Sequence, residues 1–246
     1  FRSEFYDKMR LSKGVPSTAA ITPIQFCEKY CQYVDEGYTD VIHVPINRSG
    51  SSTYNNAVMA QGMLREERPE HHLNIHLLDP HTYSMVFGWY LCEMARKLQN
   101  GAELRHVISE FETQMNKMEV ILGPYSLKQM KKSGRISAAA AVMGELMGIR
   151  PIITLIDGKT RVESKVRGDD KVIPAMIDLC KKRTEGVEDF DYMIGHTSIP
   201  QAAELEKACR KAFGKAPLTT FNLGGVVSAN TGPDTLALVY VGKPRD

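Results

Sequence analysis

The chain has 246 residues, of which 43% are hydrophobic and 24% are charged, a composition typical of a soluble globular protein with one large domain or two smaller ones. Its net charge of +2, from 31 basic and 29 acidic residues, gives no field of the strength that nucleic-acid binders use, so we expect no nucleic-acid partner. The longest apolar runs fall far short of the ~20 residues that cross a bilayer, and the N-terminus has no signal-peptide pattern. We therefore expect a cytoplasmic protein.

Five cysteines at irregular spacings argue against a disulfide framework and predict reduced thiols. Cys27 and Cys31 lie one helical turn apart, as metal ligands can, but no second pair of this kind follows and the chain has no HExxH motif. The sequence therefore predicts no metal site.

Helical patterns alternate with short apolar runs from residue 23 to residue 122. We expect helices at 23–37, 53–67, 83–101 and 103–118, and strands at 40–46, 73–79 and 119–123. Such alternation predicts βαβ units with a mostly parallel sheet. The loops after the first two strands begin at strand carboxyl ends, where open α/β sheets place their ligands.

Residues 131–168 combine a glycine-arginine turn, an alanine-rich helix, an apolar strand and a returning strand. Ser137 is a candidate N-cap, and Arg135 stands just before it, which favours an anion at this end of the helix. The small residues Ala138 to Ala141, with Gly144 and Gly148 one turn apart, leave one helix face thin enough for a narrow apolar channel or a close backbone contact. Alanine is also simply the best helix former, so an ordinary helix explains the same letters. Asp157 and Gly158 are candidates for a type I′ hairpin turn.

After residue 148 the pattern changes to a smaller unit with mixed strand directions. Helices are expected at 169–184 and 200–213, and strands at 190–195, 217–222 and 235–241. We place the domain boundary between Met147 and Arg150, which gives an N-terminal three-layer α/β/α domain of residues 1–148 and a C-terminal α/β domain of residues 149–246. A ligand site between two such domains is a common arrangement.

Five motifs in this order resemble the DegV family of bacterial fatty-acid-binding proteins. They are VPSTAAITP at 15–23, SSTYNNA at 51–57, DPHTYSMVFGWYLCEMA at 79–95, the GRIS-to-KVRG segment that ends at 168, and SANTGPDTLALVYVGK at 228–243. The resemblance covers nearly the whole chain and implies the two-domain α/β fold of that family.

The resemblance also implies a function, which is to hold a long-chain fatty acid of the palmitate or oleate class in an apolar tunnel. Its carboxylate is expected to bind Thr18 and Ser51, with Ser17 and Thr53 beside them. Without the family, Thr18 capping a turn and Ser51 lying in a solvated loop explain these residues as well. The residues expected along the tail are Met85, Phe87, Leu91, Val142 and Leu146, each of which also suits an ordinary core.

Family members of the fatty-acid-kinase type present the bound acid to a separate ATP-using kinase subunit, which makes an acyl phosphate for phospholipid metabolism. By this resemblance Arg135, Arg167 and Asn230 face the head group or the kinase, and arginine suits phosphate through its charge and forked donors. The carrier itself needs no cofactor or catalytic residue, and a transient contact with a membrane surface fits its role. The competing hypotheses are a DegV-like scaffold for another lipid and an acyl hydrolase that uses Ser51.

The sequence departs from the family pattern at several positions. Ala19 replaces a serine, and Ser52 stands where glycine is usual, so the head-group contacts are expected to differ. Asn230 replaces a histidine and cannot carry a proton, while Asp234 replaces a glycine. A DegV-like chain would also begin with a strand before Phe1, so we expect an upstream segment in the natural molecule.

Overall fold

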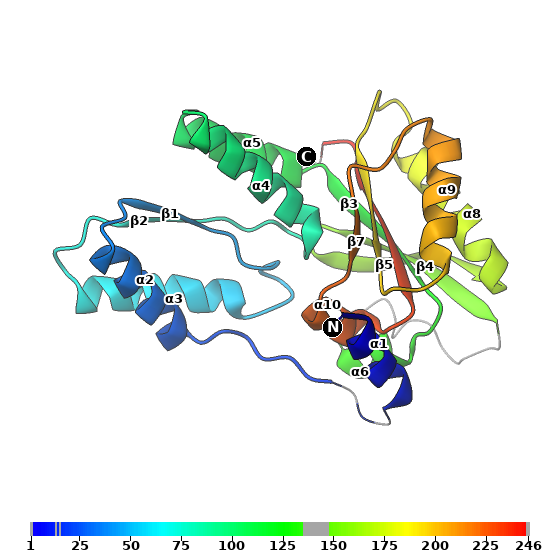
Figure 1. Ribbon diagram of the computed structural model, residues 1–246, viewed down its shortest axis with the longest axis horizontal. Helices are drawn as coiled ribbons and strands as arrows, with labels where there is room; N and C mark the ends of the chain where they lie inside the picture. Colours follow the sequence, from blue (N-terminus) through cyan, green and yellow to red (C-terminus); the bar gives the residue numbers. More distant parts are fainter. Residues whose placement is uncertain (1, 13, 15, 135–147, 245–246) are drawn as a thin grey trace. The chain divides into compact units, whose positions relative to one another are not determined.

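The computed structural model describes residues 2–12, 14, 16–134 and 148–244, which form two compact units (Figure 1). The small unit comprises residues 19–83, and the large unit comprises residues 1–18 and 84–246. The helix expected at 138–148 lies outside the described residues apart from its last position. The chain is α/β, with a two-stranded parallel sheet and a six-stranded mixed sheet.

The small unit packs two helices against a parallel strand pair. Its elements are α2 (Pro23–Asp35), β1 (Asp40–His43), α3 (Thr53–Glu67) and β2 (Asn74–Leu77). A capping box between Thr22 and Gln25 starts α2. Its buried face then packs against Ala57, Ala60 and Leu64 of α3. Because β1 and β2 run parallel from Asp40↔Asn74 to His43↔Leu77, the loops that follow them leave from the same edge, as predicted.

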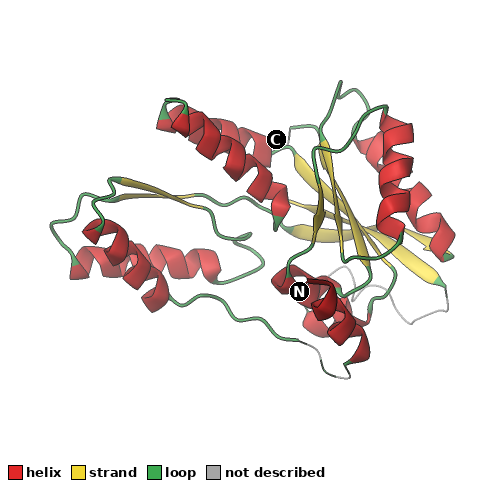
Figure 2. Ribbon diagram, viewed as in Figure 1, coloured by secondary structure: helices red, strands yellow, loops and turns green. Residues whose placement is uncertain are grey.

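The large unit is built on a sheet in the order β5-β4-β3-β8-β6-β7, in which β6 and β7 are parallel and the other neighbours are antiparallel. Figure 2 shows these strands with helices around them. The strands are β3 (Met118–Pro124), β4 (Ile149–Ile156), β5 (Lys159–Arg167), β6 (Tyr192–His196), β7 (Thr220–Asn222) and β8 (Thr235–Val241). The helices are α1 (Arg2–Leu11), α4 (Met85–Gln99), α5 (Leu104–Met115), α6 (Lys128–Ser133), the short η1 (Asp169–Lys171), α8 (Val172–Arg183), α9 (Gln201–Phe213) and α10 (Gly225–Thr231).

The compact units differ from the predicted division near residue 148, because β3 belongs to the six-stranded sheet. All seven residues of β3 are buried, and the strand pairs antiparallel with β4 on one side and with β8 on the other. An apolar run predicts a buried strand but carries no information about which strands will flank it. The sheet therefore continues across the expected boundary.

The hairpin between β4 and β5 confirms the predicted turn. Ile156 pairs with Lys159, and the two residues between them have positive φ angles, 52° at Asp157 and 72° at Gly158. Two successive positive φ angles define a type I′ turn, whose twist matches that of the flanking strands.

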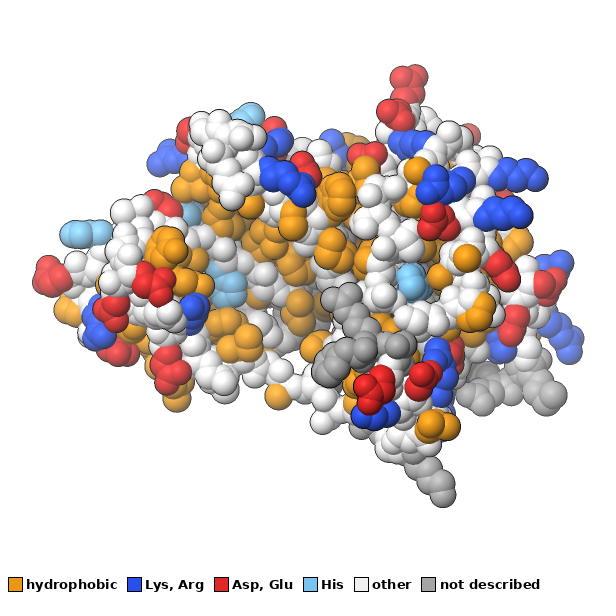
Figure 3. Space-filling view, viewed as in Figure 1, with side chains coloured by type: hydrophobic (Ala, Val, Ile, Leu, Met, Phe, Trp, Pro, Cys, Tyr) orange, Lys and Arg blue, Asp and Glu red, His pale blue; other side chains and the backbone are white. Residues whose placement is uncertain are grey.

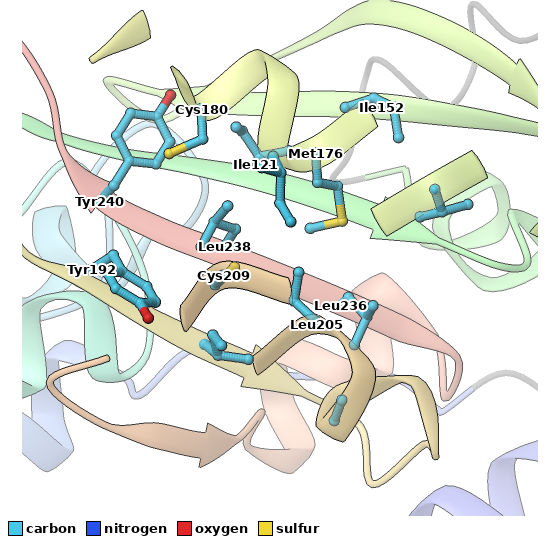
Figure 4. Packing of buried hydrophobic residues seen from close by; sticks show 14 of the residues in the cluster. Ile121, Ile152, Met176, Cys180, Tyr192, Leu205, Cys209, Leu236, Leu238 and Tyr240 are labelled. Carbon is cyan, nitrogen blue, oxygen red and sulfur yellow. The ribbon is translucent and has the colours of Figure 1, made fainter. Parts of the chain in front are cut away.

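The main core lies where α8 and α9 cover one face of the mixed sheet (Figure 4). Met176 and Cys180 from α8 and Leu205 and Cys209 from α9 pack on the sheet, and burial raises the pKa of Cys209 to about 12. Charged side chains occupy the surface over these helices, whereas hydrophobic ones are visible beside α4 (Figure 3). None of the helices in the described part of the chain combines the length and apolar character that crossing a bilayer requires.

Candidate functional site

The loops that follow β1 and β2 pack tightly against each other within the small unit. Asn47 of the first loop is 1% exposed, its N–H donates to the Thr82 carbonyl at 3.0 Å, and its amide Nδ2 donates to the Tyr83 hydroxyl at 3.0 Å. A Cβ added to Gly50 would lie 1.7 Å from that same hydroxyl oxygen. The two loops thus form one structure at the carboxyl ends of the parallel strands.

Asp79, the first residue of the motif DPHTYS, fixes this arrangement with its carboxylate. Its Oδ1 accepts a hydrogen bond from the backbone N–H of Arg48 at 3.3 Å and from that of His81 at 2.9 Å. The Arg48 guanidinium lies 5.3 Å from the centre of the Tyr54 ring. One acidic side chain therefore holds the backbone of both loops.

Ser51 and Thr53 place two hydroxyls together at the start of α3. Their Oγ atoms are 2.7 Å apart, and the Thr53 N–H donates to the Ser51 Oγ at 3.2 Å. Both residues are half-buried, whereas Ser52 between them is exposed and its side chain makes no capping hydrogen bond. Because α3 is 15 residues long, its N-terminus favours an anion beside these hydroxyls.

Thr82 is a further candidate that the sequence patterns did not single out. It is 4% exposed, and among the described residues its hydroxyl has no hydrogen-bond partner. An unpaired buried hydroxyl costs about 1–3 kcal/mol, so a polar ligand atom would stabilise it. Thr82 lies within the motif at 79–95, but the sequence does not distinguish it from the other polar residues of that motif, because its burial is known only from the structure.

Ser17 and Thr18, the other predicted carboxylate ligands, lie in an extended segment at the end of the first stretch of the large unit. Thr18 is half-buried and Ser17 is exposed. The residue that caps α2 is Thr22, through its own side chain. The predicted carboxylate ligands are thus divided between the units, with Ser51 and Thr53 in the small one.

Of the residues predicted to face the head group, Arg167 and Asn230 are described and Arg135 lies outside the described residues. Arg167 is exposed at the end of β5 and pairs with Ile149, the first residue of β4. Asn230 is half-buried in α10, where its Nδ2 donates to the Val226 carbonyl at 2.8 Å. The Ser133 hydroxyl donates to the Met130 carbonyl at 3.0 Å and lies 3.4 Å from the Asn230 carbonyl, so the end of α6 contacts α10.

Asp234, which departs from the family pattern expected from the sequence, ties its loop to α1. Its carboxylate accepts from Arg10 Nε at 2.9 Å, while Arg10 Nη2 donates to the Pro233 carbonyl at 2.8 Å. On the other side, the Thr197 hydroxyl donates to the same carbonyl at 2.6 Å. Asp234 thus has a defined partner, Arg10, in this chain.

The tail-lining candidates on α4 are half-buried. Met85, Phe87 and Leu91 have this intermediate exposure, whereas the same helix fully buries Val86 and Met94. Burial raises the pKa of the neighbouring Tyr90 to about 12. The two other candidates, Val142 and Leu146, lie outside the described residues.

Comparison with known proteins identifies the family. A model described as an uncharacterised protein of the DegV family matches residues 2–243, so the chain belongs to the DegV family. A DegV domain-containing protein of Staphylococcus aureus strain COL is 29% identical over 245 residues, which are 98% of this chain and 82% of the relative. A DegV domain-containing protein of Clostridium perfringens is 29% identical over 240 residues, covering 96% of this chain and 81% of the relative.

Solved structures give the same fold. A stearic acid-binding protein from Eubacterium ventriosum superimposes with a TM-score of 0.87 at 21% identity, covering 99% of this chain and 84% of that one. A fatty acid binding DegV family protein from Streptococcus agalactiae gives a TM-score of 0.84 at 26% identity, with the same coverage. A Thermotoga maritima protein described as revealing a fatty acid binding function gives 0.79 at 23% identity, covering 98% of this chain and 82% of that one.

Proposed function

We propose that this protein binds a long-chain fatty acid and presents its carboxylate to a separate ATP-using kinase subunit, which forms an acyl phosphate. The protein itself performs no catalysis in this scheme. Membership of the DegV family and the fatty acids bound by structurally similar proteins support the proposal. The observation that carries it is the pair of hydroxyls of Ser51 and Thr53 at the N-terminus of α3.

The chemistry of this pair suits a carboxylate. A carboxylate taken out of water needs hydrogen-bond donors, because an unpaired buried charge costs several kcal/mol or takes up a proton. Both hydroxyls can donate to its oxygens once their mutual hydrogen bond opens, and the helix N-terminus adds a favourable dipole. The buried hydroxyl of Thr82, which has no hydrogen-bond partner in the described part of the chain, is a third potential donor in the same unit. A hydrolase that uses Ser51 gains no support from these contacts, since the hydrogen bonds described for its hydroxyl are with Thr53.

The tail and the head group contribute differently to binding. Burying ~14 methylenes at ~0.8 kcal/mol each gives about 11 kcal/mol before the cost of association. A hydrogen bond to a charged group contributes only about 1.5–3 kcal/mol. The tail therefore sets the affinity, while the hydroxyls orient the carboxylate for transfer.

Calorimetric titration of the delipidated protein with palmitate tests the carboxylate site. Ser51→Ala is expected to weaken binding roughly 10- to 100-fold, which is the equivalent of one charged hydrogen bond. Ser52→Ala is the matched control, because that side chain is exposed and forms no cap hydrogen bond. Equal affinities of both variants and the wild type would remove Ser51 from the site. The prediction for Thr18 is tested in the same assay with Thr18→Val.

The kinase step has its own test with a fatty acid kinase subunit, ATP and the palmitate-loaded protein. Arg167→Ala is expected to lower acyl-phosphate formation while palmitate binding stays close to that of the wild type. Arg161→Ala, exposed on the same strand, is the control and should change neither measurement. If Arg167→Ala weakens binding and acyl-phosphate formation equally, the role assigned to Arg167 is wrong. Asn230→His, which restores the family residue, should raise the rate of transfer if a proton carrier is needed there.

A further inference from the structure

The small unit contains a cluster of three metal-ligating side chains where α2 contacts α3. Cys27 and Cys31 lie four residues apart on α2, and Glu67 is the last residue of α3. One ligand atom from each, the two sulfurs and a carboxylate oxygen, lie within 4.8 Å of one another. Both cysteines are buried and Glu67 is exposed, so the cluster opens to solvent on its carboxylate side.

The distances suit a tetrahedral metal ion. Zn–S bonds are about 2.3 Å long and Zn–O bonds about 2.0 Å. Around one tetrahedral ion, a sulfur and an oxygen ligand therefore lie about 3.5 Å apart, and two sulfur ligands lie about 3.8 Å apart. The Cys27 Sγ donates to the Glu67 Oε2 over 3.6 Å. The sulfurs therefore need to approach each other by at most about 1 Å, which small side-chain rotations provide.

The charges around the cluster are also suited to a cation. Two thiolates and a carboxylate carry three negative charges, of which a divalent ion neutralises two. Arg68 Nη1 lies 3.8 Å from the other Glu67 oxygen, Oε1, and so offsets the remaining charge without occupying Oε2. A thiol must lose its proton to ligate a metal, so the binding of an ion by the two cysteines releases protons.

We infer that Cys27, Cys31 and Glu67 bind one thiophilic divalent cation of the zinc type, with water completing its coordination. Two sulfur ligands select zinc over magnesium or calcium, which prefer oxygen ligands. Such an ion joins the middle of α2 to the end of α3 and stabilises the small unit. The site is independent of the proposed fatty-acid function, because its residues lie outside the loops that follow β1 and β2.

The test uses the full chain, kept reduced, stripped of metal with a chelator and then titrated with Zn²⁺ against a chromophoric zinc indicator. Co²⁺ substitution provides a second readout, because thiolate ligands give a near-ultraviolet charge-transfer band that oxygen ligands do not. The variants are Cys27→Ser, Cys31→Ser and Glu67→Gln. Cys92→Ser is the matched control, since Cys92 is an exposed cysteine in the large unit.

The wild type and Cys92→Ser are expected to bind one equivalent of Zn²⁺, with a rise in melting temperature and the cobalt–thiolate band. Removing a residue that only orients a metal ligand lowers metal affinity roughly 10- to 100-fold. Each cysteine variant removes a ligand itself and should therefore lose at least that much Zn²⁺ affinity. Glu67→Gln keeps both buried cysteines and an exposed side chain of the same size, so it tests the site without disturbing the helix contact. Wild-type protein that takes up no Zn²⁺, or variants that bind it as tightly as the wild type, would overturn the inference.

Discussion

The contact between Gly50 and Tyr83 predicts a large effect for a very small substitution. Gly50→Ala adds one methyl group that would lie 1.7 Å from the Tyr83 hydroxyl oxygen and 2.9 Å from the ring carbon that bears it. Ordinary contact begins near 3.4 Å, so the hydroxyl must retreat by about 1.7 Å. That movement breaks the 3.0 Å hydrogen bond from Asn47. Gly50 does not have a positive φ, so its backbone accepts alanine and the steric contact is the main cost.

The magnitude follows from two contributions. Overpacking costs about 1–3 kcal/mol, and the lost hydrogen bond costs about 0.5–1.5 kcal/mol. We therefore expect Gly50→Ala to lower the opening free energy of the small unit by about 1.5–4.5 kcal/mol. Gly62→Ala is the matched control, because an added Cβ there has no neighbour within 4 Å among the described residues and α3 should gain about 0.5–1 kcal/mol.

Hydrogen exchange of peptides from α2 and α3 measures this free energy within the small unit. Tyr83→Leu removes the hydroxyl oxygen and the two ring carbons nearest to the added methyl group, so Gly50→Ala should cost little in that background. The double-mutant cycle then gives a coupling of about 2 kcal/mol. Unchanged exchange in Gly50→Ala, or a coupling near zero, would refute the proposed packing of the two loops. Palmitate affinity should fall in Gly50→Ala and recover poorly in the double variant, because the loop structure depends on Tyr83.

Three other substitutions test the structure in different ways. Glu119→Gln should lower the free energy of unfolding by about 2–4 kcal/mol in urea titrations, because the buried carboxylate, 5% exposed, accepts two hydrogen bonds from Arg183. Burial lowers the pKa of His43, so below pH ~6.5 the unfolded chain binds more protons than the folded chain. The free energy of unfolding therefore decreases as the pH is lowered, by up to about 1.4 kcal/mol per pH unit, until the folded pKa is reached. His43→Gln should flatten that slope in pH-dependent unfolding. Asp234→Gly, which restores the family residue, should lower the free energy of unfolding by no more than about 1 kcal/mol, because its ion pair with Arg10 is one-third exposed. The expected result is a small fall in melting temperature.

Controls and contrary outcomes separate these effects from general damage. Glu4→Gln removes an exposed i,i+4 pair with Lys8 and should leave the stability nearly unchanged. If Glu119→Gln is equally mild, the buried ion pair is not the source of stability. A slope that His43→Gln leaves unchanged would mean that other groups cause the acid sensitivity.

Much of the site is visible in the sequence because its parts are local. The motifs at 51–57 and 79–95 follow apolar strand patterns, and parallel strands bring the loops after them to one edge. Ser51 and Thr53 are only two residues apart, so their hydroxyls come together when the chain turns into α3 at Thr53. The type I′ turn at Asp157 and Gly158 is local in the same way, because two residues determine its backbone angles.

Other features depend on which elements meet in three dimensions. Glu67 follows Cys27 by 40 residues and reaches it only because α3 packs on α2, so no sequence spacing announces the three-residue cluster. Thr82 stands out only when its burial and its lack of a partner among the described residues are known.

The sequence by itself determined the family, the α/β class, the parallel strand pair and the turn residues, because each of these is encoded in a local pattern or a motif. Only the tertiary structure decided that β3 lies between β4 and β8, with strand pairs on both sides. The physical reason is that an apolar strand can satisfy its backbone hydrogen bonds in either a parallel or an antiparallel sheet. Its neighbours are selected by the packing of the whole unit, which no local stretch of the chain contains.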